Sequence, residues 1–323
     1  MVKFGIGQAI KRVEDQRLLT GQGSYTDDVT PDGIARAFIL RSPYAHARIN
    51  RIDTADADAA PGIIAVLTNK HVKEDELGDL PCLAPAPNKD GSERASTPRP
   101  ILEGNKVRHV GTPVAMVIAE TLDQARDAAE LINVEYEPLQ SATDTEGAAK
   151  PGAAQLYDHI PNNICFDWQK GDLESAEAAF ARAARVVQTK VVNNRIIVNS
   201  MEPRGAIGLY DAETDRTTLY SSTQGPGFIH PLLAEIVLKI DKNKLRCITT
   251  DVGGGFGMKI FLYPEQCLLA WASRRLKRAV KYTPERSEAF MSDTQGRDNI
   301  SYVDAALDAN GKIIGLKVET FAN

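Results

Sequence analysis

The stretch Asp251-Val-Gly-Gly-Gly-Phe-Gly-Met-Lys259 decides how the rest of this sequence is interpreted. Glycine has no Cβ, so this stretch can turn tightly and place its backbone N–H groups against a ligand. A helix that followed it would offer free N–H donors to an anion. The spacing matches neither GxGxxG nor the Gly-Lys pair of a phosphate-binding loop. The glycines alone therefore allow two interpretations, a tight strand-to-helix turn or a cofactor-binding loop.

A second candidate loop lies upstream, at Ser221-Ser-Thr-Gln-Gly-Pro-Gly227. It ends a strand pattern over residues 217–222 and precedes a helix pattern over residues 228–239. Gln224 in this loop can both donate and accept hydrogen bonds. Residues 245–252 form a mostly apolar strand pattern that leads into the glycines. If the two strands are neighbours, both loops face one crevice at the same end of the sheet.

The composition is that of a globular protein with about two domains. The chain has 323 residues, of which 43% are hydrophobic and 25% are charged. The 38 Lys+Arg and 43 Asp+Glu residues give a formal net charge of −5. A slightly acidic surface does not attract nucleic acid or an anionic membrane, because both require a basic field. We therefore expect a small-molecule substrate and no nucleic-acid partner.

The four cysteines, Cys82, Cys165, Cys247 and Cys267, are far apart and form no CxxC pair. Their spacing excludes a local zinc ribbon or iron–sulfur cluster, so we expect each to be a small core residue of a reduced, cytoplasmic protein. Residues 1–7 lack the apolar run of a signal peptide. The longest apolar runs, such as residues 114–119, are far shorter than the roughly 20 residues of a membrane span.

The sequence predicts an α+β fold in two parts. In the first part we expect a helix over residues 121–132, which Thr121 caps, and a long polar loop over residues 83–100. The β-branched and apolar runs predict strands over residues 35–41, 63–68, 114–119 and 134–136. Residues 142–154 are rich in Ala, Thr, Gly and Pro, which predicts a boundary between domains 1–145 and 146–323.

The second part repeats the mixture of helices and strands. Its patterns predict helices over residues 172–186 and 263–276 and strands over residues 187–192, 217–222, 245–252, 299–307 and 312–321. A turn at Asp308-Ala-Asn-Gly311 joins the last two strands. An uncovered final strand is an aggregation hazard, so we expect either a fragment or a sheet that another chain completes.

Taken together, the motifs resemble the molybdopterin-binding large subunit of the xanthine dehydrogenase and aldehyde oxidase family, which includes aerobic carbon monoxide dehydrogenases. The resemblance rests first on Thr223-Gln-Gly-Pro226, Val252 to Lys259 and Tyr263-Pro-Glu265. Five stretches resemble the family's hammerhead domain: Arg12-Val-Glu-Asp15, Leu19-Thr-Gly21, Tyr25-Thr-Asp-Asp28, Arg41 to Ile49 and Val107 to Ala115. Met201-Glu-Pro-Arg-Gly205 and Gln295-Gly-Arg-Asp298 resemble the following domain. The resemblance extends from about residue 8 to the end of the chain.

This resemblance implies a hammerhead-type α/β domain followed by the first part of a molybdopterin-binding domain. It implies that Gln224 lies beside the molybdenum oxo group, and that Gly254, Gly255, Phe256 and Gly257 bind the cofactor. The metal is then held by the pterin dithiolene and by no protein side chain. Arg297 is a further candidate hydrogen-bond donor to the cofactor, whose known forms include a cytosine dinucleotide.

Departures from the family pattern limit the substrate and the catalytic residues that the resemblance implies for this chain. Members that oxidise xanthine carry a Glu four residues after the Phe, where this chain has Ile260, so a purine substrate is disfavoured. The family's general-base Glu lies beyond this sequence, as does the Cys loop of carbon monoxide dehydrogenases. We therefore expect no catalytic residue in this chain, and a complementary molybdopterin-binding chain or C-terminal part that completes the site.

The resemblance implies a molybdenum-dependent oxidoreductase that hydroxylates an N-heterocycle or an aldehyde with oxygen from water. Electrons would pass to partner subunits that carry 2Fe-2S clusters and FAD, because this chain has neither cluster cysteines nor a dinucleotide fingerprint. Two alternatives stay open. One is part of an aerobic carbon monoxide dehydrogenase large subunit, and the other is a non-catalytic assembly or binding module.

The remaining polar residues have simpler interpretations. A lone histidine is more often structural than a ligand or an acid–base group, and we expect this of His46 and His109 and also of His230, which follows the Gln224 loop. Glu202 and Glu265 could act as acid and base, but we expect them to form ion pairs. The cationic cluster at residues 274–278 is typical of a solvated helix end, although it could also form an anion site or a partner contact.

Overall fold

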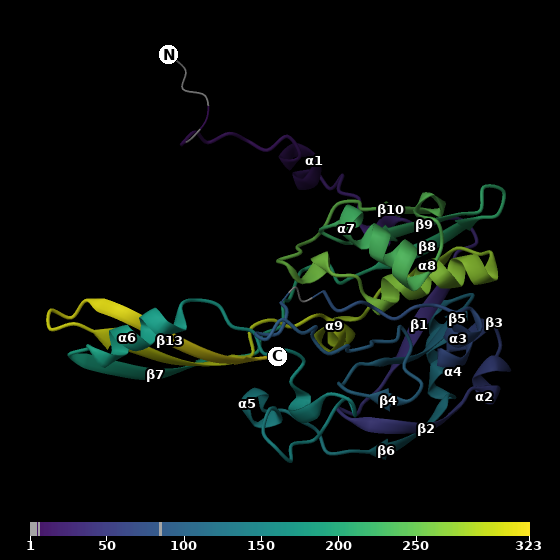
Figure 1. Ribbon diagram of the computed structural model, residues 1–323. Helices are drawn as coiled ribbons and strands as arrows, with labels where there is room; N and C mark the ends of the chain where they lie inside the picture. The colour runs from purple at the N-terminus through teal and green to yellow at the C-terminus, as the bar shows by residue number, and fades with distance from the viewer. Residues whose placement is uncertain (1–4, 6, 84–85) are drawn as a thin grey trace.

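The structure is a computed structural model that describes residues 5, 7–83 and 86–323, and it confirms the expected α+β fold (Figure 1). Most of residues 1–7, where we expected no signal peptide, and residues 84–85 of the expected 83–100 loop lie outside the described residues. Among the helices of the described part, none combines the length and the apolar character that crossing a membrane requires.

The main sheet has seven strands in the order β10-β9-β8-β11-β1-β5-β3. These strands are β1 (Ala35–Arg41), β3 (Ile63–Thr68), β5 (Pro113–Ala119), β8 (Ala206–Asp211), β9 (Arg216–Ser221), β10 (Leu245–Ile248) and β11 (Val280–Tyr282). Two neighbouring pairs are parallel, β9 with β10 and β1 with β11, and the other pairs are antiparallel. Since β1 lies beside β11, with Ala35 opposite Val280, one sheet contains strands from both halves of the chain.

The described residues also form two smaller antiparallel sheets. One contains β4 (Lys106–Val107), β2 (Ala47–Asp53) and β6 (Asn133–Pro138). The other contains β13 (Ile313–Ala322), β12 (Asn299–Leu307) and β7 (Arg185–Asn193), and it extends away from the main body together with α6 (Figure 1). The hairpin expected at residues 308–311 joins β12 and β13, and the N–H of Gly311 donates to the carbonyl of Asp308 at 3.1 Å.

The helices are short, apart from the one that fills the core. They are α1 (Asp15–Leu19), α2 (Ala55–Asp58), α3 (Asn69–Glu74), α4 (Leu122–Glu130), α5 (Thr145–Ala148), α6 (Leu173–Ala181), α7 (Pro226–Pro231), α8 (Pro264–Leu276) and α9 (Arg286–Ser292). Thr121 caps α4 as expected, since its hydroxyl accepts the N–H of Gln124 at 3.3 Å. Asp172 likewise caps α6.

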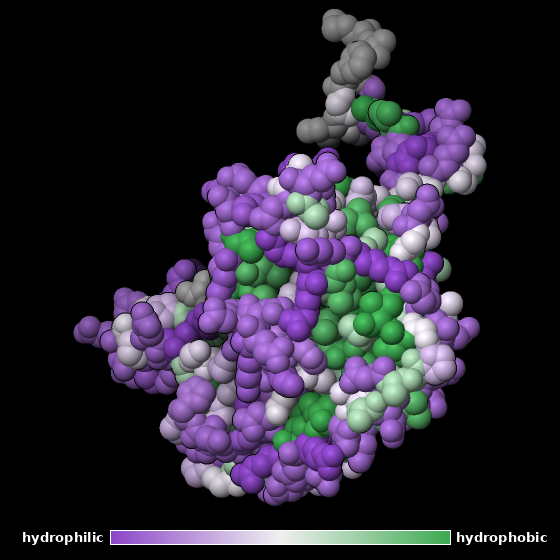
Figure 2. Space-filling view, turned by 90° about the vertical axis from the view of Figure 1, so that its right-hand side faces the viewer, coloured by the Kyte–Doolittle hydropathy of each residue, from purple (hydrophilic) through white to green (hydrophobic). Residues whose placement is uncertain are grey.

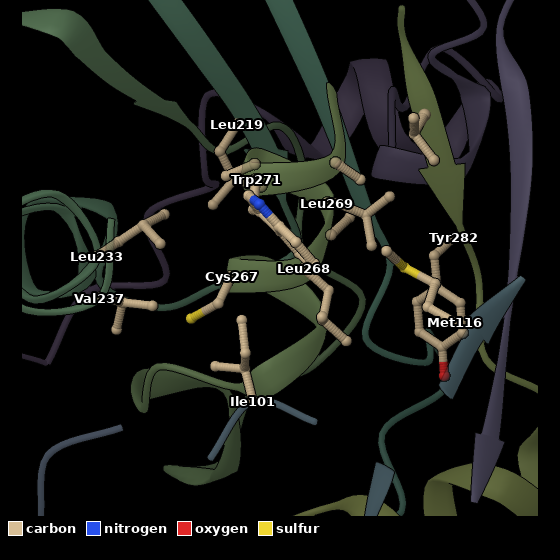
Figure 3. Close-up of a cluster of buried hydrophobic side chains, with 14 of the residues drawn as sticks. Ile101, Met116, Leu219, Leu233, Val237, Cys267, Leu268, Leu269, Trp271 and Tyr282 are labelled. Atoms are coloured by element: carbon tan, nitrogen blue, oxygen red, sulfur yellow. The ribbon is translucent and has the colours of Figure 1, made fainter. Parts of the chain in front are cut away.

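The central core forms around α8 (Figure 3). Proline at the first helical position and the capping contact from the Tyr263 N–H to Gln266 start this helix. Its backbone lies directly on β8, where a Cβ on Gly208 would come within 1.9 Å of the Leu269 carbonyl oxygen. Leu268 and Trp271 are buried on the helix, and the Trp271 indole donates to Asp75 at 2.6 Å. On the face seen in Figure 2, hydrophobic residues lie in patches between hydrophilic ones.

Several expected elements end elsewhere in the structure. The helix expected over 172–186 stops at Ala181, because the β-branched residues Val186 and Val187 belong to β7. The helix expected over 228–239 divides into α7 and a π-helical segment, Leu232–Val237, after Pro231, which has no N–H to donate. The strand expected over 245–252 ends at Ile248. The structure also contains β2, β4, β8 and β11, which the patterns did not predict.

The cysteines only partly confirm the expectation of core residues. Cys267 is fully buried in α8, and Cys247 packs half-buried against the same core. Burial raises the pKa of the Cys247 thiol to about 12. The expectation is wrong for Cys82 and Cys165, which lie half-buried in loop segments because no strand or helix carries them into the core.

Candidate functional site

The Gln224 loop and the glycine loop leave the same edge of the main sheet. β9 and β10 are parallel neighbours, with Leu245 opposite Thr217, so the segments that follow them start side by side. The carboxamide oxygen Oε1 of Gln224 accepts the N–H of Gly257 at 2.9 Å. The N–H of Gln224 donates to the carbonyl of Lys259 at 3.0 Å. The expectation that the two loops lie together at one end of the sheet is therefore confirmed.

Glycine is required where the loops touch. A Cβ on Gly255 would lie 2.4 Å from the side-chain carbons of Gln224, so any larger residue would displace the Gln224 side chain. Phe256 follows with φ +52°, a left-handed conformation that a bulky residue rarely adopts, and its side chain is 75% exposed. Such outliers cluster at functional sites, where the surrounding structure holds them in place. The glycine loop thus presents an exposed aromatic ring between Gly255 and Gly257, the two residues that adjoin Gln224.

The same loop carries unsatisfied backbone donors. Within the described residues, the N–H groups of Gly254, Gly255 and Phe256 donate to no protein acceptor. Consecutive N–H groups of this kind form a concave donor set that suits an anionic or oxygen-rich group. After the loop comes a single 3-10 turn, Met258–Ile260, and α8 begins only at Pro264. The helix that would directly follow the glycines is therefore absent from the described structure, and the donors belong to the loop itself.

A buried lysine lies beneath the two loops. The Lys259 side chain is 0% exposed, and its Nζ lies 2.7 Å from the Ser222 hydroxyl and 3.1 Å from Oε2 of Glu202. Oε2 of Glu202 also accepts the N–H of Gly253 at 2.8 Å. Burial lowers the pKa of Lys259, and the Glu202 carboxylate opposes that shift. The predicted ion pairing of Glu202 is confirmed, but its partner was not predicted.

Glu265 is the centre of a second buried ionic cluster. One carboxylate oxygen lies 2.5 Å from Arg41 and the other 2.8 Å from Arg204, and all three side chains are at most 6% exposed. Arg204 also contacts Asp293 at 2.6 Å. Burial would raise the pKa of Glu265, but Arg204 and Arg41 outweigh it and lower the pKa to about 2. Glu265 therefore forms ion pairs as expected, and neither it nor Glu202 pairs with the other as acid and base.

Arg297 is the one predicted site residue that lies apart from the loops. Its side chain is exposed, its φ is +70°, and it precedes β12. Among the described residues, no hydrogen bond joins Arg297 to the Gln224 loop or to the glycine loop. The adjacent Asp298 forms an ion pair with Arg195. The assignment of Arg297 to the cofactor stays a prediction.

The histidines contact backbone carbonyls, as expected for structural residues. Nδ1 of His46 lies 2.7 Å from the Gln140 carbonyl oxygen, and Nε2 of His230 lies 2.9 Å from that of Leu245. Nδ1 of His109 lies 2.9 Å from the Val110 carbonyl oxygen, and burial lowers the pKa of this imidazole. His46 is only half satisfied, because within the described residues its buried Nε2 has no hydrogen-bond partner.

The cations at the end of α8 are ion-paired with other segments. Arg275 contacts Asp75 at 2.6 Å, and Arg278 contacts Glu120 at 2.5 Å. Both arginines are about 30% exposed, so the helix end is partly solvated. In the described part of the chain, no group of three or more His, Cys, Asp or Glu side chains is arranged to hold a metal ion.

Two family comparisons match the chain. Residues 156–323 match the molybdopterin cofactor-binding domain, and residues 20–140 match the a/b hammerhead domain of aldehyde oxidase and xanthine dehydrogenase. The chain therefore belongs to the xanthine dehydrogenase and aldehyde oxidase family, and it carries a hammerhead domain followed by a molybdopterin cofactor-binding domain. The resemblance found in the sequence motifs is confirmed.

Individual relatives match nearly the whole chain. It is 32% identical over 318 residues to the nicotine 6-hydroxylase large subunit of Paenarthrobacter nicotinovorans, covering 98% of this chain and 38% of the relative. It is 32% identical over 331 residues to the carbon monoxide dehydrogenase large chain of Afipia carboxidovorans, covering 99% of this chain and 39% of the relative. The fold matches quinoline 2-oxidoreductase from Pseudomonas putida 86 with a TM-score of 0.87 and 34% identity, covering 97% of this chain and 39% of the other. The chain thus spans about two fifths of the length of these relatives.

Proposed function

We propose that this chain is part of the large subunit of a molybdenum hydroxylase, with domains over residues 1–145 and 146–323. The substrate class is an N-heterocycle or an aldehyde. When bound, the molybdenum cofactor would supply the two-electron oxidation of a substrate carbon with oxygen derived from water. The work of this chain is to hold the cofactor and to orient it.

The contact between the two loops carries this proposal. Oε1 of Gln224 accepts the N–H of Gly257. Its Nε2 makes no hydrogen bond within the described residues, so this donor is free for a ligand. The unpaired N–H groups of Gly254, Gly255 and Phe256 likewise need acceptors that the described residues do not supply. The residues present therefore fit an oxygen-rich cofactor that brings its own metal ligands.

Ile260 supports a substrate other than a purine. Its side chain is 38% exposed, and its Cγ1 would lie 3.6 Å from a Cβ placed on Gly225, so it adjoins the Gln224 loop. An apolar side chain cannot hydrogen-bond the ring nitrogens of a purine, and sites that need such bonds discriminate strongly by them. We infer an apolar contact for the substrate at this position.

One exposed face supports a complementary molybdopterin-binding chain or C-terminal part. In the sheet of β7, β12 and β13, Val187, Ala305 and Leu316 are aligned on one face, as are Thr189, Val303 and Val318. Helix α6 packs on the opposite face, where Ala179 adjoins Gly315. Leu316 and Val318 are 55% and 54% exposed, so this apolar face is uncovered. We infer that the rest of the large subunit packs here, and that iron–sulfur and FAD subunits accept the electrons.

The native assembly that contains this chain tests the proposal. We expect close to one molybdenum per protomer, iron and flavin on co-purifying subunits, and release of a cytosine nucleotide from the denatured cofactor. Turnover would then be screened with N-heterocycles, aldehydes and carbon monoxide. Lack of molybdenum in a correctly assembled complex would refute the proposal and favour a non-catalytic binding module.

The second candidate function is the oxidation of carbon monoxide. The chain is 32% identical both to a carbon monoxide dehydrogenase large chain and to the nicotine 6-hydroxylase large subunit. The substrate screen separates the two. Oxidation of carbon monoxide without oxidation of any heterocycle or aldehyde would establish the alternative.

A further inference from the structure

Lys259 is the most deeply buried charged side chain at the two loops. Lysine normally keeps its ammonium group in water and buries only its stem. Here the whole side chain is 0% exposed, so the ammonium group must be held by partners inside the protein. Those partners are the Ser222 hydroxyl at 2.7 Å and Oε2 of Glu202 at 3.1 Å. A buried charge in such a place requires a structural reason.

The backbone of the same residue holds the Gln224 loop. The Lys259 carbonyl oxygen accepts the N–H of Gln224 at 3.0 Å and the hydroxyl of Thr223 at 2.8 Å. Its ammonium group meanwhile contacts Ser222, the next residue back along that loop. Both ends of Lys259 therefore hold the segment that carries Gln224.

Glu202 connects the ammonium group to the start of the glycine loop. Its Oε2 accepts the N–H of Gly253 at 2.8 Å and the Ser222 hydroxyl at 2.6 Å, and its backbone N–H donates to the Gly253 carbonyl at 3.1 Å. The other oxygen, Oε1, is buried and has no hydrogen-bond partner within the described residues. All the hydrogen bonds that the carboxylate accepts in the described chain go to Oε2, and Lys259 is the cation that balances its charge.

We propose that Lys259 and Glu202 form a positioning pair that fixes the Gln224 loop against the glycine loop. The inference rests on the proposed function, because it assigns these loops to the cofactor. Without the ammonium group, the negative charge of Glu202 would have no cationic partner under Gly253. The carboxylate would then be stabilised most easily by turning towards water. Gly253 would then lose its acceptor, and the separation between Gly255 and Gln224 would increase.

The test substitutes Lys259→Met in the full assembled complex, because methionine keeps the apolar stem and the backbone carbonyl. We expect molybdenum and nucleotide content to fall about tenfold or more, because removing one partner of a buried ion pair leaves an uncompensated charge at the loops. The Mo(V) electron paramagnetic resonance signal of the retained fraction should also change. Glu202→Gln keeps an acceptor for Gly253 and should give an intermediate loss, so the proposal stays testable if Lys259→Met does not assemble.

Lys281→Met is the matched control. Lys281 is also buried, at 3% exposure, in β11 of the same sheet, but its Nζ contacts the carbonyl of Asp27 at 2.5 Å and that of Val29 at 3.2 Å, away from both loops. We expect it to lower the unfolding temperature but to leave cofactor content unchanged. Equal cofactor loss in the two lysine variants would overturn the positioning role, because general destabilisation would then explain both.

Hydrogen exchange separates a failure of this inference from a failure of the proposed function. Peptides that cover residues 221–227 and 251–259 should exchange faster in Lys259→Met and at the wild-type rate in Lys281→Met. This readout does not require bound molybdenum. A wild-type assembly without molybdenum would refute the proposed function, whereas unchanged exchange in Lys259→Met would refute the positioning pair.

Discussion

Strands β5 and β7 differ both in composition and in surroundings. Every residue of β5 is apolar, whereas β7 alternates pairs of valines with polar and charged residues. All seven residues of β5 are buried, whereas all nine residues of β7 are exposed. β5 lies between β1 and β3, and its alternate residues enter two cores: Met116 and Ile118 one, Val117 and Ala119 the other. β7 is an edge strand of the sheet that extends from the body, with α6 packed on the opposite side of that sheet from Val187 and Leu316. Even the four valines of β7 are exposed, so an apolar residue in a strand enters a core only where a neighbouring element covers it.

The same contrast applies to charged residues. In the body, Glu265 is surrounded by arginines at 2% exposure, whereas the Arg48–Glu137 pair between β2 and β6 is about half exposed at 3.7 Å. Breaking a buried ion pair leaves an unpaired buried charge, whereas an exposed pair is already solvated. The Glu265 cluster should thus contribute far more to stability than the Arg48–Glu137 pair does.

The largest expected effect is that of Glu265→Ala. It leaves Arg41 and Arg204 buried without a shared carboxylate, which should cost about 3–5 kcal/mol of unfolding free energy. Glu137→Ala is the exposed control and should cost less than about 0.5 kcal/mol. Denaturant unfolding of both variants measures the difference. Equal losses would show that burial does not distinguish the two sites.

A second prediction compares the two strands directly. Met116→Ala in β5 should cost about 2–4 kcal/mol, because it opens a cavity in the core. Val191→Ala in β7 should cost less than about 0.5 kcal/mol in the separate chain, because that side chain is 49% exposed. In the full assembly we expect the cost of Val191→Ala to rise if the remainder of the subunit covers this face. An unchanged cost in the assembly would argue against that cover.

A third prediction concerns acid. Glu265 has its pKa lowered from 4.5 to about 2 in the folded chain, so its contribution to stability is present above pH 4.5 and is lost as the pH falls through 2. Between pH 7 and pH 4, this group should remove about 1 kcal/mol of unfolding free energy. Comparing wild type with Glu265→Gln at both pH values isolates its share, since the amide does not titrate. A wild-type slope that survives in the variant would assign the loss to other groups.

These contrasts also show what the sequence could predict. The bounds of β1, β3 and β12 match the sequence prediction to the residue, because runs of apolar and β-branched residues end at turns there. The contact between Gln224 and the glycine loop was expected only on condition that the strands were neighbours, which β9 and β10 satisfy. β11 was missed because its three residues are too few to show a period.

The buried charges were beyond prediction for a different reason. Lys259 follows a glycine run, where a lysine is normally solvated, and its partner Glu202 lies 57 residues earlier in the chain. The pairing becomes visible only when β9 and β10 bring the segments that follow them together. The assignment of Arg297 to the cofactor rests on a motif alone and stays a prediction, since Arg297 is exposed and precedes β12.

Among these substitutions, we expect Phe256→Ala to have the smallest effect on stability but a clear effect on function. The Phe256 ring is 75% exposed, so Phe256→Ala should change the unfolding free energy by less than about 0.5 kcal/mol. In the assembled complex, the same change should lower turnover or molybdenum content, because the exposed ring lies on the loop assigned to the cofactor. Leu131→Ala, at 48% exposure at the end of α4, is the control for an exposed apolar residue away from the loops and from the apolar face of the β7–β12–β13 sheet. Phe256→Ala with full molybdenum content and full turnover would show that the loop is held in its left-handed turn for packing with Gln224, and that its aromatic ring does not serve the cofactor.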